Sequence, residues 1–304
     1  MKNIYLLKAL ITAVLIAPFG GGGLLAQMPN DAIYMPKGMV CVGTMYSHSS
    51  WSQYWENTLK RENLNIGTHT TQSMMVMPAI GITDRVNVIL SLPYVWTKTS
   101  AGNLMGQKGF QDLSAWLKVK AVDIKGFSVN GLVGASIPVS KYVPDFLPMS
   151  IGLQCRVVAG RVLVNYTHPK TGLYITGHGT YMWRSNINVD RDAYQADGRV
   201  YNTNEVRVPN AYDMGARFGI LKKKWQTEVW AERNSCVNGD NIRRNDMPFP
   251  TNNMQTTMVG WYGKFQPKAL GVNARVGYVT NGLNAGQSTS YMVGVLYLFG
   301  IKKS

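Results

Sequence analysis

Polar and apolar residues alternate along most of this chain with a period of two. The clearest case is residues 110–122, where the even positions from Asp112 to Lys120 form a polar set and the odd positions from Leu113 to Ala121 are apolar. Successive side chains of a β-strand point to opposite faces, so this segment is predicted to be a strand with one wet and one dry face. A helix would place Leu117 and Lys118 only about 100° apart and would mix the two sets.

The same alternation predicts an all-β fold of twelve strands. It is strong in the middle and at the end of the chain and weakest in the first, second and seventh segments. The twelve predicted strands are residues 37–48, 67–79, 86–95, 110–122, 126–137, 151–157, 173–184, 211–221, 225–234, 254–265, 271–280 and 290–299.

The links between these strands are alternately short and long. Short turns at one rim and long loops at the other are typical of an outer-membrane barrel with both chain ends in the periplasm. The link at 158–172 breaks this rule, because it belongs to the rim of short turns but is long, and the pattern does not explain it. The tight links are 83–85, 123–125, 222–224 and 266–268, and the longer ones are 49–66, 96–109, 138–149, 185–210, 236–253 and 281–288.

Composition favours a membrane barrel over a soluble β-sandwich or a lectin-like domain. Charged residues make up 15% of the chain, against about 25% in an average soluble domain. Ten strand residues, tilted by about 40°, cover roughly the 25 Å apolar band of such barrels. Tyr and Trp also gather near the predicted strand ends, as in an aromatic girdle. We therefore predict a transmembrane antiparallel outer-membrane β-barrel of about twelve strands.

The first 26 residues have the layout of a secretory signal peptide. A short basic start precedes an apolar run of about 14 residues, and the small residue Ala26 offers a cleavage site before Gln27. The run is shorter than the roughly 20 apolar residues of a membrane-spanning helix, and it contains Lys8. We expect residues 27–304 to form one barrel domain in the outer membrane.

If the apolar face meets lipid, the opposite face lines the lumen. Two interpretations of the lumen charges remain open: an ionic ladder that stiffens the wall, or a constriction that favours anionic solutes. Slipping the fourth strand by one residue would push Lys118 and Lys120 into lipid at a cost of about 4–8 kcal/mol. The candidate lumen residues are Asp112, Trp116, Lys118, Lys120, Arg156, Arg184, Asp213, Arg217, Glu228, Glu232, Lys264 and Arg275.

The segment before the first predicted strand is short. Residues 27–36 are too few for a plug domain, so any gate is expected to come from long loops that fold inward. The loops at 50–66 and 185–210 are the main candidates, and the loop at 97–109, rich in small residues, is a third.

Enzymatic, metal and nucleic-acid functions find little support. The three cysteines show no metal-binding or disulfide spacing, and the four histidines are scattered, so we expect no metal and no cofactor. Ser47 and His48 are neighbours on one strand and point to opposite faces, which argues against a catalytic pair. The formal charge of +15 is dispersed, and exported proteins rarely meet nucleic acid. Basic loop residues either bind lipopolysaccharide phosphates or are simply solvated.

Three stretches of sequence resemble a known family. They are Tyr54-Trp55 through Asn65-Ile66-Gly67-Thr68, then Gly81-Ile82-Thr83-Asp84-Arg85-Val86-Asn87-Val88 with Leu92-Pro93-Tyr94, then Gly109-Phe110-Gln111-Asp112-Leu113. This series is similar to outer-membrane barrels of the phenol-degradation meta-pathway transporter type, mainly over the part of the chain before about residue 125. The resemblance implies a channel for small hydrophobic or aromatic compounds, with Thr83-Asp84-Arg85 as a periplasmic turn.

These observations lead to two hypotheses about function. The first is an outer-membrane channel for passive uptake of small solutes. The second is a structural or surface-binding barrel with a filled lumen, which acts through its extracellular loops. Both have outer-membrane lipid and lipopolysaccharide as partners, and only the first has a small-molecule solute.

Overall fold

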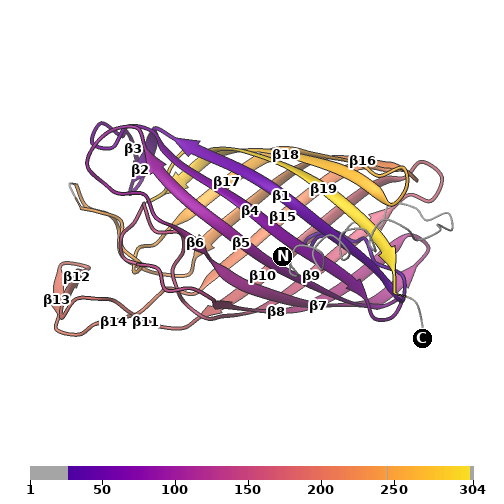
Figure 1. The fold of residues 1–304 in the computed structure, drawn as a ribbon, viewed down its shortest axis with the longest axis horizontal. Coiled ribbons are helices and arrows are strands. Elements are labelled where there is room, and N and C mark those ends of the chain that lie inside the picture. Colours follow the sequence, from indigo (N-terminus) through magenta and orange to yellow (C-terminus); the bar gives the residue numbers. More distant parts are fainter. Residues whose placement is uncertain (1–26, 245, 302–304) are drawn as a thin grey trace, which may run out of the picture.

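The computed structural model describes residues 27–244 and 246–301 and shows a closed antiparallel barrel of twelve long strands (Figure 1). The predicted fold and number of strands are confirmed. The predicted signal peptide, residues 1–26, lies outside the described residues. The barrel strands are β1 (Met39–Trp51), β4 (His69–Gly81), β5 (Val86–Thr99), β7 (Asp112–Ile124), β8 (Phe127–Pro138), β9 (Val157–Thr167), β10 (Leu173–Arg184), β15 (Ala211–Leu221), β16 (Trp225–Cys236), β17 (Gln255–Phe265), β18 (Leu270–Leu283) and β19 (Thr289–Gly300).

The barrel closes because its first strand pairs with its last. β1 lies between β19 and β4, with Met39 opposite Gly300 on one side and Val40 opposite Ile80 on the other. β4 in turn pairs with β5, so each of the twelve strands has two neighbours. Closure satisfies the backbone N–H and C=O groups of every strand, which a spanning sheet needs in lipid.

The alternation in the sequence becomes an apolar outside and a polar inside. On β7, Leu113, Leu117 and Val119 are exposed on the outer surface, whereas Lys118 between them is completely buried. Exposed large apolar side chains follow the outer face of the other strands in the same way. Such a belt is costly in water and stable in lipid. The fold and this belt place the chain in an outer membrane.

Aromatic side chains meet near the loop end of this belt. Tyr94 packs edge-to-face on Phe110, with ring centroids 5.2 Å apart. On the neighbouring strands, the indole N–H of Trp96 donates to Gln72 (3.0 Å), whose amide donates to the hydroxyl of Tyr46. This is the arrangement of an aromatic girdle at a membrane interface. Within the described residues, no helix has the length and apolar character needed to cross a membrane.

The prediction of a strand at 151–157 is wrong, and its correction explains the link at 158–172. The strand is β9, and the turn after it is only His168–Gly172, so every link at this rim is short. Alternation is weak in β9 because its inner face carries the buried apolar residues Ala159 and Leu163. Residues 151–157 alternate for a different reason: their apolar side chains pack among the loops.

The long loops at the other rim carry structure of their own. Loop 185–210 folds into two small hairpin-like pairs that extend away from the barrel (Figure 1). Cys155, predicted on a strand face, instead lies in a loop and joins an apolar cluster with Val206 and Val208. The short strands of this rim are β2 (Gln53–Glu56), β3 (Leu59–Glu62), β6 (Lys108–Phe110), β11 (Ile187–Asn188), β12 (Tyr194–Ala196), β13 (Arg199–Tyr201) and β14 (Glu205–Val206).

Candidate functional site

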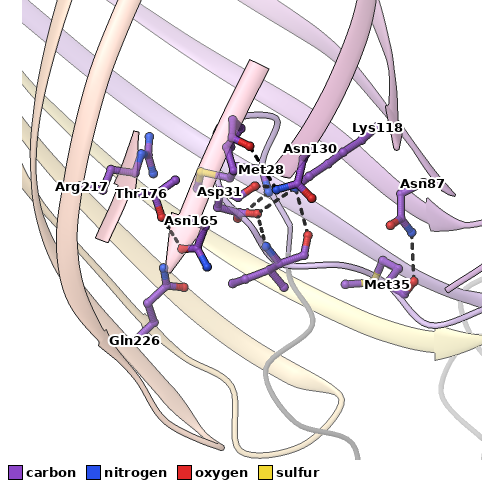
Figure 2. A network of polar contacts seen from close by, with 12 residues as sticks. Met28, Asp31, Met35, Asn87, Lys118, Asn130, Asn165, Thr176, Arg217 and Gln226 are labelled. Carbon is purple, nitrogen blue, oxygen red and sulfur yellow. Dashed lines mark hydrogen bonds and ion pairs between the residues drawn. The ribbon is translucent and has the colours of Figure 1, made fainter. Parts of the chain in front are cut away.

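Residues 27–36, called here the lumen segment, lie inside the barrel. The Nζ of Lys118 is 3.3 Å from the Asp31 carboxylate and 3.0 Å from the carbonyl oxygen of Ile33, and it also binds the carbonyl of Asp31 (Figure 2). Met35 is fully buried in an apolar cluster with Met77 and other inner side chains. The segment that was expected to be too short for a plug domain thus lies inside the lumen and packs on its wall.

The hairpin motif in the sequence binds the lumen segment and the chain that follows it. The side-chain amide of Asn87 donates to the carbonyl of Met35 (3.0 Å), and the Lys37 N–H donates to the Asp84 carboxylate (3.0 Å). Gly81 leaves room for this contact, because a Cβ there would lie 2.1 Å from the carbonyl oxygen of Pro36. Gly81, Asp84 and Asn87 thus position residues 35–37, in addition to their part in the hairpin.

The other motif residues shape the hairpin itself. The hydroxyl of Thr83 accepts from the N–H of Arg85 (3.2 Å) within the turn. The carbonyl of Arg85 accepts from the N–H of Lys120 (2.9 Å) on the neighbouring strand. Pro93 lies in β5, where its carbonyl accepts from the N–H of Gln111 (3.0 Å).

One buried polar network surrounds Glu228 near the lumen segment. Its carboxylate accepts from Nη1 of Arg217 (2.7 Å), from the amide of Gln226 (3.2 Å) and from the hydroxyl of Tyr174. Arg217 and Glu228 are diagonal neighbours on the paired strands β15 and β16, where Arg217 lies opposite Trp230, and both are almost completely buried. The pair is stable only because hydrogen bonds complete the carboxylate's coordination.

A second network follows the inner wall from β9 to β18, nearer the loops. Arg161 pairs with Asp213 (3.1 Å), and Arg275 pairs with Glu232 (3.0 Å). His178 lies between them, with Nε2 3.2 Å from Asp213 and 3.8 Å from Glu232. Two tryptophan rings support the guanidinium groups: Trp116 lies 5.0 Å from Arg161, and Trp230 lies 3.8 Å from Arg275. Charges here are compensated in pairs, as the ionic-ladder interpretation predicts.

The second network also contains three side chains of metal-binding type. The ligand atoms of His178, Asp213 and Glu232 lie within 4.8 Å of one another. However, Asp213 already faces the guanidinium of Arg161, and Glu232 faces that of Arg275. A divalent cation would have to displace or approach both positive groups, so the arrangement suits an ion-pair network better than a metal centre.

The rim of long loops is partly covered by loop 139–156. The hydroxyl of Tyr142 donates to Asp112 (2.7 Å), while Thr97 donates to the carbonyl of Met149 (2.7 Å). Burial raises the pKa of Tyr142, so its phenol stays protonated and remains a donor. Tyr142 and Ile151 of this loop form a small buried cluster with Val95 of β5.

The structure groups most of the sequence-predicted lumen residues by depth. Asp112 and Arg184 lie at the loop rim, and Arg184 contacts the carbonyl of Pro209 (3.3 Å). Arg156 belongs to a loop and is exposed, so its assignment to a strand face is wrong. Lys120 lies near the short-turn rim, 2.9 Å from Asp123. The other predicted lumen residues belong to the two networks or lie beside them. They are Trp116, Lys118, Asp213, Arg217, Glu228, Glu232, Lys264 and Arg275.

Sequence reasoning missed Asp31, Arg161 and Tyr174. Arg161 lies in the strand that was predicted as a loop, so its place on the inner face was hidden. Tyr174 lies in the predicted strand 173–184 but was not named as a lumen residue, although its hydroxyl binds Glu228. Asp31 had one available signal: it is an isolated acid in a short segment that leads into the barrel.

Comparisons with known proteins identify the fold. An outer-membrane channel from Pseudomonas putida F1 superimposes with a TM-score of 0.67 at 15% identity, covering 90% of this chain and all of that one. The NanC porin (TM-score 0.48, 10% identity, 83% of this chain and 98% of that one) and the translocator domain of the autotransporter NalP from Neisseria meningitidis (0.47, 13%, 85% and 87%) are more distant, and no argument depends on them.

The chain is an outer-membrane β-barrel. At 15% identity, the likeness to the Pseudomonas channel concerns the fold alone. No protein-family model matches the sequence, and no curated protein matches it either. The resemblance to the phenol-degradation family therefore stays a prediction from the three sequence stretches.

Proposed function

We propose that this protein is a channel through which small solutes cross the outer membrane passively, and that the lumen segment closes its inner end at rest. One observation carries the proposal. The interior is a polar, ion-paired space, and what obstructs it at the short-turn rim is a ten-residue segment held by separable contacts from Lys118 and Asn87. Moving that segment would unblock the inner end while leaving the strand pairing of the wall intact.

The nature of the solute is the finer part of the proposal. The resemblance of the hairpin motif implies small hydrophobic or aromatic compounds. The rings of Trp116 and Trp230 lie on the lumen side, where each packs against a guanidinium group. The proposal assigns no catalytic step to the lumen. Residues 1–26 serve as export signal, and basic loop residues such as Arg243 and Arg244 contact lipopolysaccharide phosphates.

Solute uptake by liposomes that contain the refolded barrel tests the channel directly. Heat-modifiable gel migration first establishes that each sample is folded. We expect uptake of small aromatic compounds above that of empty liposomes, and a clear increase when residues 27–36 are deleted. If neither the folded wild type nor the folded deletion variant takes up any small solute, the channel hypothesis is wrong.

A filled structural barrel is the second candidate, and one observation favours it. The two polar networks and the lumen segment together occupy much of the interior, while the loops form small sheets and an apolar cluster of their own. Such a barrel would stay impermeable after deletion of residues 27–36, because the ion pairs between Arg161, Asp213, Glu232 and Arg275 would still fill part of the lumen.

A further inference from the structure

Arg217 has two hydrogen-bond donors without an acceptor. Its side chain is 3% exposed, and Nη1 donates to Glu228. Its Nε and Nη2 have no hydrogen-bond partner among the residues that the structure describes. A buried guanidinium group normally satisfies its N–H groups, because each one left unpaired in a dry site costs free energy. Nε and Nη2 of Arg217 therefore need a hydrogen-bond acceptor, and the described part of the chain supplies none.

A cavity of about 270 Å³ lies beside this guanidinium group. Asp31 to Tyr34 of the lumen segment form one side of it, and Arg217, Gln226 and Thr176 belong to the opposite wall (Figure 2). The Oε1 of Gln226 is also buried without a partner in the described part of the chain. The cavity is smaller than the pockets that enclose drug-sized ligands, so it fits a small molecule.

The neighbouring carboxylates do not accept hydrogen bonds from Nε or Nη2 of Arg217. Glu228 already accepts from Arg217 Nη1, Gln226 and Tyr174. Asp31 lines the cavity, but its carboxylate accepts from Lys118 and from the N–H groups of Met28 (2.8 Å) and Ile33 (3.0 Å). The charge of each acid is thus already compensated, and neither has a free oxygen for Arg217.

A second basic side chain also lines the cavity. Lys120 belongs to its wall together with Arg217. An added anion would therefore be attracted to this part of the lumen.

We propose that the cavity binds a small organic carboxylate through the side-chain edge formed by Nε and Nη2 of Arg217. Two parallel N–H donors on one edge of a guanidinium match the two oxygens of a carboxylate, which is a strong and specific geometry. Ile33, Tyr34 and Leu221 also line the cavity and surround the apolar body of the ligand. A hydroxyl on that body would donate to Oε1 of Gln226. The site depends on the proposed function only for the route by which the ligand arrives.

Calorimetric titration of the folded full-length protein in detergent tests the site without transport. The probes are benzoate and the neutral isostere benzamide. We expect benzoate to bind at least tenfold more tightly than benzamide. The variant Arg217→Lys keeps a positive charge next to Glu228 but removes Nε and Nη2, so benzoate affinity should fall at least tenfold. The variant Arg199→Lys makes the same substitution at an exposed position of the loop strand β13 and should bind benzoate like the wild type.

Several results would overturn the proposal. Equal binding of benzoate and benzamide would do so, as would unchanged affinity in a folded Arg217→Lys barrel. Inorganic phosphate that binds as tightly as benzoate would contradict the carboxylate class. Where Arg217→Lys does not fold, thermal unfolding of the wild type decides, because only a ligand of the folded state raises the midpoint. Benzoate should raise it and benzamide should not.

The outcome is independent of the channel hypothesis. Benzoate that binds a barrel impermeable to all solutes would leave this site standing and contradict the channel. Uptake of small aromatic compounds by a barrel that binds no benzoate would support the channel and contradict the carboxylate site.

Discussion

The Nζ of Lys118 lies 3.3 Å from the carboxylate of Asp31, and the lysine is completely buried. The two residues are 87 positions apart in the chain, one on the barrel wall and the other in the lumen segment. A buried cation of this kind needs its partner, because leaving one charge of such a pair uncompensated costs about 3–5 kcal/mol. The relationship therefore fixes the position of the segment against the wall.

The first prediction concerns this pair. Asp31→Asn leaves Lys118 without its counter-charge, and we expect a loss of about 3–5 kcal/mol in the free energy of unfolding. Lys118→Met removes the charge itself. A double-mutant cycle measured by denaturant unfolding in detergent should show that the double variant loses less than the sum of the single ones. Strict additivity would mean that the two side chains do not interact.

The second prediction concerns Gly81. A Cβ at this position would lie 2.1 Å from the carbonyl oxygen of Pro36 and 2.8 Å from that of Met35. Gly81→Ala should displace the lumen segment at an overpacking cost of about 1–3 kcal/mol while the barrel stays folded. Limited proteolysis should then cut residues 27–36 faster than in the wild type. Gly177→Ala is the matched control, since a Cβ there has nothing within 4 Å, and it should leave the cleavage rate unchanged.

The third prediction tests the corrected strand β9. Val162 is 58% exposed on the outer face of β9, so Val162→Arg places a charge in lipid and should cost about 2–4 kcal/mol. Val200 is 68% exposed in the loop hairpin, and Val200→Arg should change stability by less than about 0.5 kcal/mol. Equal stability of the two variants in lipid would place residue 162 outside the membrane.

The fourth prediction concerns the ion pairs of the lumen. Glu232→Gln removes the partner of Arg275 and leaves one more uncompensated positive charge in the pathway. In a bilayer under a salt gradient, the reversal potential of the open barrel should shift toward anion selectivity relative to the wild type. Glu205→Gln, an exposed loop variant with the same change in charge, should leave the reversal potential where it was.

The fifth prediction concerns the thiols. Cys41, Cys155 and Cys236 are all free and buried, so a maleimide should label the folded protein slowly and the unfolded protein completely. Burial raises the pKa of the Cys155 thiol. Because the thiolate is the reactive form, labelling of Cys155 should increase only at pH values above the usual thiol range. Rapid labelling of Cys155 at neutral pH would show that the loop cluster opens readily.

The period of two predicted the barrel because lipid and lumen impose opposite polarity on alternate side chains. It failed at β9, where Ala159 and Leu163 make the inner face apolar as well. It also failed at 151–157, where Ile151 and Cys155 are buried by loops and imitate the dry face of a strand. Local polarity cannot distinguish burial against lipid from burial against another loop.

The candidate site was predictable only in part. Strand parity indicated that Lys118, Arg217 and Glu228 face inward, because a charge on the outer face would be very costly. The pairing of Arg161 with Asp213 was less accessible, because it depends on the strand register, which places Thr180 of β10 between them. Gly81, Asp84 and Asn87 were visible as a motif, but their contacts with residues 35–38 require the three-dimensional structure.

The lumen segment is joined to β1 by only Lys37 and Gly38. A released segment therefore remains tethered at the mouth of its own barrel, at an effective concentration on the order of millimolar. Its return is a first-order step, whose rate is independent of how many copies share a membrane. A separate peptide of residues 27–36, added to a barrel that lacks them, would need to approach that concentration to close it equally well.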